Sequence, residues 1–179
     1  MKKQLTLRNI AGYVTEKAVW QLILSLSEGS RQGGLQGISP DKIIVQGKSF
    51  LLSDDRSKDV ATSFAAPETF TRQTIQQEVS DVWTIGALAF YAITGTDVFE
   101  GKGGETQNCD TEVPRLGSAH ASYTLGKLVR RCLSYPPEER PGNDEIRQVA
   151  QTMLEEASLP RKRLAGKVGK SYTSSLIKF

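Results

Sequence analysis

Residues whose side chains could do chemistry are sparse in this sequence. His120 is the only histidine, and no nucleophile or acid stands at a recognised spacing from it. The two cysteines, Cys109 and Cys132, are too few for a disulfide framework and lack the partners of a zinc site. The glycine-rich stretch 101–104 follows no strand and precedes no Lys-Ser or Lys-Thr pair, so it does not predict a phosphate-binding loop. Catalysis by histidine or by a zinc site is therefore not expected.

The first elements along the chain are a helix and a hairpin. Thr15 is predicted to cap a helix whose apolar residues recur three and four positions apart, and which stops at 28–29. Two short apolar runs, 42–45 and 50–52, are joined tightly around Gly47 and predict a β-hairpin. The polar residues that follow are expected to end it.

The centre of the domain is predicted to be a helix over 82–94. It is apolar almost all round, so it must be buried on every side, and Ser80 or Asp81 is expected to cap it. Residues 95–119 indicate a loop with at most a short helix. Two amphipathic helices then close the domain, the second capped by Asn143. Their apolar stripes are Tyr123, Leu125, Leu128, Val129, Cys132 and Leu133 in the first, and Ile146, Val149, Ala150, Met153 and Leu154 in the second.

Charge divides the chain into two parts. Of 23 basic and 20 acidic residues, six basic and no acidic ones lie from Arg161 onward, so residues 1–160 carry 17 basic against 20 acidic, a net of −3. We expect a domain over 1–158 and a basic tail or linker over 159–179. A solvated linker is favoured for the tail over nucleic-acid binding, because six charges spread over 19 residues are few. Weak membrane contact, or folding against the acidic domain, are the alternatives.

No segment has the character of a membrane span or a secretory signal. The N-terminal residues lack an unbroken apolar region. The longest apolar stretch, 82–93, is shorter than the roughly 20 residues that cross a bilayer. We therefore expect a cytoplasmic protein, or the cytoplasmic part of a larger one.

Several short motifs share an order and spacing that belong to one known family. They are LQGISPDKIIV at 35–45, LSDDR at 52–56, APE at 66–68, DVWTIG at 81–86, and Cys132-Leu133 followed by Pro136, Pro137, Arg140 and Pro141. Together they resemble the C-terminal lobe of a protein kinase, from roughly Leu5 to Leu154, in a degenerate form without the N-terminal lobe. The resemblance implies a mainly α, kinase C-lobe-like helical domain with a short β-hairpin.

The residues of phosphoryl transfer do not match this family. The position of the catalytic aspartate is Gly37, which has no side chain, and that of the magnesium-binding asparagine is Lys42, a cation that would repel the metal. Only Asp54, where the magnesium aspartate belongs, survives as a weak metal candidate, and a turn cap or a partner of Lys42 is the favoured role for it. The resemblance therefore implies no catalytic residue, no cofactor and no enzyme activity.

The retained residues are those that hold the family's fold together. The resemblance implies that Asp81 accepts hydrogen bonds from the loop backbone around Gly37 and Ile38, that Glu68 and Arg140 form a buried ion pair, and that Trp83 is a core residue. A fold kept without its reaction indicates a pseudokinase-like module, similar in concept to kinase non-catalytic C-lobe domains, that serves protein interaction or regulation in signalling.

The expected interaction surface is the face that an N-terminal lobe would cover. Its predicted residues are Leu35, Ile38, Lys42 and Asp54, and an apolar patch there would need a protein partner or a second copy of the chain. The alternative is the C-lobe half of a split kinase that a separate N-lobe partner completes. That partner would have to bring both the base and a metal ligand.

Overall fold

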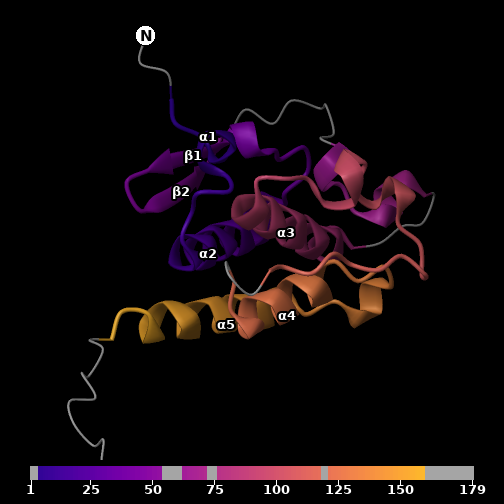
Figure 1. Ribbon diagram of the computed structural model, residues 1–179. Coiled ribbons are helices and arrows are strands. Elements are labelled where there is room, and N and C mark those ends of the chain that lie inside the picture. The colour runs from indigo at the N-terminus through magenta and orange to yellow at the C-terminus, as the bar shows by residue number, and fades with distance from the viewer. Residues whose placement is uncertain (1–3, 54–61, 72–75, 118–120, 160–179) are drawn as a thin grey trace, which may run out of the picture.

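The computed structural model describes residues 4–53, 62–71, 76–117 and 121–159 (Figure 1). In these parts the chain is mainly helical with one two-stranded antiparallel hairpin, which confirms that level of the prediction. The helices and strands are α1 (Leu7–Ile10), α2 (Glu16–Gly33), β1 (Ile43–Gln46), β2 (Ser49–Leu52), α3 (Gln77–Thr94), α4 (Tyr123–Cys132) and α5 (Asn143–Glu156). Asp54 and His120 lie outside the described residues, as does nearly all of the predicted tail.

Helix α3 forms the centre of the core. Its residues 81–93 are all buried, as the apolar sequence predicts. Figure 1 shows α2 and α4 lying beside α3, α5 running along α2, and the hairpin resting on α2. The predicted loop region carries two short 3-10 turns, Val98–Gly101 and Gly103–Thr106. The helices and the hairpin therefore bury their apolar faces against one another.

Helix α2 starts where the sequence predicts and ends one turn later. The side chain of Thr15 accepts a hydrogen bond from the amide of Ala18 at 3.3 Å, but the helix continues through Gly29 to Gly33. A Cβ atom on Gly29 would lie 2.2 Å from Cδ1 of Leu52. The glycine lets the hairpin approach the helix closely, so it is a packing residue and not a helix stop.

Two predicted helix caps lie inside their helices. Helix α3 begins at Gln77, so Asp81 sits in its second turn. Helix α5 is preceded by Gly142, and Asn143 is its first residue. The Asn143 side chain is buried and pairs with Ser27 of α2, both donating to the Ser27 carbonyl at 3.1 Å and accepting from its hydroxyl. A buried amide needs such partners, which here tie α5 to α2.

Two further features differ from what the sequence predicts. The pattern predicts Tyr123 in the apolar stripe of α4, yet this first residue of the helix is 84% exposed. Helix α1 was not predicted, since four residues are too few to show a periodic pattern. Its residue Leu7 is fully buried in the core.

Candidate functional site

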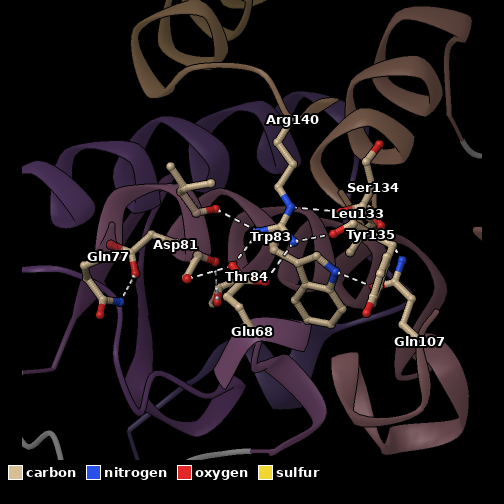
Figure 2. Close-up of polar contacts among 12 residues, drawn as sticks. Glu68, Gln77, Asp81, Trp83, Thr84, Gln107, Leu133, Ser134, Tyr135 and Arg140 are labelled. Atoms are coloured by element: carbon tan, nitrogen blue, oxygen red, sulfur yellow. Dashed lines mark hydrogen bonds and ion pairs between the residues drawn. The ribbon is translucent and has the colours of Figure 1, made fainter. Parts of the chain in front are cut away.

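The loop between α2 and β1 corresponds to the predicted catalytic-loop motif, and a buried carboxylate anchors its start. Asp81, 1% exposed, accepts hydrogen bonds from the Leu35 amide at 3.1 Å and from the Ser30 hydroxyl and the Gln77 amide group, each at 2.7 Å (Figure 2 shows the contact with Gln77). Asp81 therefore accepts from the loop backbone, but at a different residue from those that the resemblance implies, Gly37 and Ile38. The amide described as its donor is Leu35, two residues before the predicted Gly37.

Lys42 closes the other end of this loop. Its Nζ donates a hydrogen bond to the carbonyl oxygen of Gly37 at 2.9 Å. A cation therefore neighbours the backbone of Gly37, the position that the sequence resemblance aligns with a catalytic aspartate. The predicted pairing of Lys42 with Asp54 lies outside the described residues.

The apolar residues of the predicted interaction face are not on the surface. Leu35 and Ile38 are each 3% exposed and belong to the hydrophobic core. Leu35 packs beside Gly29, where one of its methyl carbons would be 3.4 Å from an added Cβ. The loop turns its leucine and isoleucine inward into the hydrophobic core, so these two side chains cannot receive a partner.

A surface ion pair between Arg8 and Asp41 connects α1 to the same loop. The Arg8 Nε atom of α1 lies 2.7 Å from both carboxylate oxygens of Asp41, the residue before Lys42. Both side chains are about half exposed, so this pair contributes little to stability. It nevertheless engages the carboxylate of Asp41, the acidic residue of the loop itself.

Glu68 and Arg140 form the buried ion pair expected from the sequence. Arg140 Nη1 and Nη2 lie 2.6 and 2.9 Å from the two oxygens of Glu68, and both side chains are at most 5% exposed (Figure 2). The remaining donors of Arg140 reach the carbonyls of Ser134, Tyr135 and Val79. All five N–H donors of the guanidinium are therefore used.

Burial and hydrogen bonding act in opposite directions on the pKa of Glu68. Burial alone would raise it, but the hydrogen bonds from Arg140 and from the Ser80 hydroxyl outweigh burial and hold the pKa below its ordinary value. The pair is therefore ionised at neutral pH. It joins the segment around Pro67 to α3 and to the turn before α5.

Trp83 is a core residue, as predicted, with one polar contact that the sequence did not indicate. Its Nε1 donates to Gln107 at 2.9 Å, and the Gln107 side chain donates to the Leu133 carbonyl at 2.6 Å (Figure 2). The ring also stacks on Phe99, with centroids 6.2 Å apart. Nothing in the pattern around Gln107, a polar residue in a loop, marks it as buried.

The described residues offer little for acid-base or metal chemistry. Within the described ranges there is no group of three or more His, Cys, Asp or Glu side chains that could hold a metal ion. The Cys132 thiol is buried, and burial raises its pKa to about 12, which makes it a poor nucleophile.

No helix in the described parts of the chain is long and apolar enough to cross a membrane. No known protein-family model matches the sequence.

Proposed function

We propose that this chain is a catalytically inactive, kinase C-lobe-like module that acts through protein-protein interaction in the regulation of signalling. The observation that carries the proposal is the bond from Lys42 to the Gly37 carbonyl. Phosphoryl transfer requires a base for the substrate hydroxyl and an uncharged or anionic ligand for Mg²⁺. At these two positions the chain has a glycine and an ammonium group that binds the loop itself.

The buried polar contacts support the proposal that the chain keeps the fold without the residues for phosphoryl transfer. Asp81 anchors the loop, and Glu68 with Arg140 anchors the neighbouring segment, each with well-made hydrogen bonds. Neither cluster holds an unsatisfied group that would await a substrate, since no buried side-chain nitrogen or oxygen among the described residues lacks a partner. These contacts fit a scaffold role, with binding to partners on the surface.

The split-kinase alternative is less well supported. An N-lobe partner could bring nucleotide and a strand lysine, but it would also have to supply a base beside Gly37 and displace Lys42 from the loop. We therefore keep it only as an outcome of the following experiment.

The test is thermal unfolding of the whole chain, with and without millimolar ATP and Mg²⁺. We expect the same melting temperature in both conditions, because ligand that binds the folded state alone must raise it. ADP with Mg²⁺ and Mg²⁺ alone are the matched controls. A rise specific to nucleotide would contradict the proposal and favour the split kinase.

A further inference from the structure

Among the described residues, the outer edge of β2 has backbone groups without hydrogen-bond partners. The register pairs Ile43 with Leu52, and the amide of Ser53 donates to the carbonyl of Lys42 at 2.8 Å. In an antiparallel ladder, opposed residues exchange hydrogen bonds at every second position. Phe50 and Leu52 therefore direct their N–H and C=O groups away from β1. Within the described chain no hydrogen bond from outside the hairpin reaches either residue.

The opposite edge of the hairpin is already covered by the chain itself. There the amide of Val45 donates to the carbonyl of Leu5 at 2.9 Å, and Thr6 bridges to Ile44. Val45 is the residue opposite Phe50, so its outward amide confirms which residues face away from the ladder. The hairpin thus has one closed edge and one open edge.

The open edge borders a groove between the hairpin, α2 and α5. The groove has a volume of about 530 Å³, within the range of sites that hold small ligands or short segments. Its lining residues are Phe50, Leu51 and Leu52 from β2, Leu24, Ser25, Glu28, Gly29 and Gln32 from α2, and Arg147 and Gln151 from α5. Leu51 is 47% exposed and Leu24 is half-buried, so the groove offers apolar contacts beside the free backbone groups.

One charge in the groove has no partner. Arg147 is half-buried and makes no hydrogen bond or ion pair within the described parts of the chain. Glu28, on the α2 wall, is exposed and accepts a hydrogen bond from Gln32 at 2.9 Å. The group in greater need of a counter-charge is therefore the guanidinium, whose planar donors fit a carboxylate.

We infer that this groove binds an extended peptide segment of a partner protein, which adds a strand to β2 and places an acidic side chain against Arg147. Strand addition uses backbone hydrogen bonds for affinity and alternate side chains for specificity. Phe50 and Leu52 supply the backbone groups, and Leu24 and Leu51 supply apolar contacts. The inference rests on the proposed interaction function and specifies its site and its class of partner.

The test begins with a random heptapeptide library displayed on phage and panned on the whole chain. We expect enrichment of sequences that alternate apolar residues and contain Asp or Glu. A synthetic peptide of the enriched sequence should slow the hydrogen exchange of the Phe50 and Leu52 amides, as measured by NMR. Methylation of the peptide nitrogens that face β2 should weaken binding about tenfold or more.

The charge contact is tested with a matched pair of variants. Arg147→Glu should weaken the peptide about tenfold or more, because it replaces attraction by repulsion. Arg130→Glu is the control, since Arg130 is exposed on α4 and does not line the groove; it should bind as the original chain does. Far-UV circular dichroism of each variant checks that the fold is intact.

Several results would overturn the inference. They are no enrichment over an uncoated surface, equal binding by Arg147→Glu, or equal binding of the methylated peptide. Protection of Phe50 and Leu52 that grows with protein concentration in the absence of peptide would make a second copy of the chain the occupant. The nucleotide experiment is independent of this one. If nucleotide raises the melting temperature and the peptide also binds, only the proposed function is refuted. If nucleotide has no effect and no peptide binds, only this site is refuted.

Discussion

Two arginines seven positions apart, Arg140 and Arg147, have opposite environments. Arg140 is buried, and all five of its N–H donors form hydrogen bonds, to Glu68 and to three backbone carbonyls. Arg147 is half-buried in a groove and has no partner in the described chain. A guanidinium whose donors are all used holds structure together. One that lines a groove and has no hydrogen bond or ion pair among the described residues has the properties of a binding group.

The largest effect should come from removing Arg140. Arg140→Ala would leave the Glu68 carboxylate buried without its counter-charge, which typically costs about 3–5 kcal/mol. Urea unfolding followed by circular dichroism measures the loss in free energy of unfolding. The double variant with Glu68→Ala should lose less than the sum of the two single variants. An unchanged free energy of unfolding in Arg140→Ala would remove the ion pair from the account of stability.

The next effect should come from the loop anchor. Asp81→Ala would leave the Leu35 amide and the Ser30 hydroxyl without their described acceptor, at a cost of about 1–3 kcal/mol for each group left unsatisfied. The same unfolding assay measures the loss. Asp144→Ala is a matched control, because Asp144 is exposed and forms only a long surface contact with Arg31. Equal stability of the two variants would show that Asp81 does not anchor the loop.

The pH dependence of stability should test the ion pair between Glu68 and Arg140. The pKa of Glu68 is lower in the folded chain than its ordinary value, which is about 4.3 for an unperturbed Glu. Its contribution is therefore fully present above pH 4.3 or so and is lost as pH falls through the folded pKa. Unfolding free energies measured from neutral to acid pH should fall less steeply in Glu68→Gln than in the original chain. Equal slopes would contradict this.

The smallest effect should come from Arg147. Arg147→Ala should change the free energy of unfolding by no more than about 0.5 kcal/mol, because the side chain loses no hydrogen bond or ion pair to the described residues. The measurement is again urea unfolding, beside Arg130→Ala as a second exposed arginine. A loss comparable to that of Arg140→Ala would mean that Arg147 supports the fold, and the contrast between the two arginines would fail.

The elements that the sequence predicted well are those with strong local patterns. The apolar run of α3, the Thr15 cap and the turn at Gly47 depend on neighbouring residues, so they could be read along the chain. The helix ends were less accurate. Gly29 resembles a helix stop in sequence, but its role depends on Leu52 of the hairpin, a contact that no local pattern shows.

The candidate site was predicted in part. The pairing of Glu68 with Arg140 and the anchoring role of Asp81 came from a resemblance that covers distant segments together. The predicted apolar face was wrong for Leu35 and Ile38, because exposure depends on which side of a loop faces the core, and a loop has no period to indicate this. The groove at β2 was missed, since it arises where three separate elements meet.

The difference between the two edges of the hairpin has a consequence for stoichiometry. Leu5 and Thr6 occupy the β1 side, so among the described residues the β2 side is the edge that remains open to another strand. If the inferred strand addition takes place, each chain would hold one guest strand at a time, and a guest and a second copy of the chain would compete for the same place. A partner bound at this edge would then prevent two chains from pairing through it. The partner would therefore determine how many copies of the chain a complex contains.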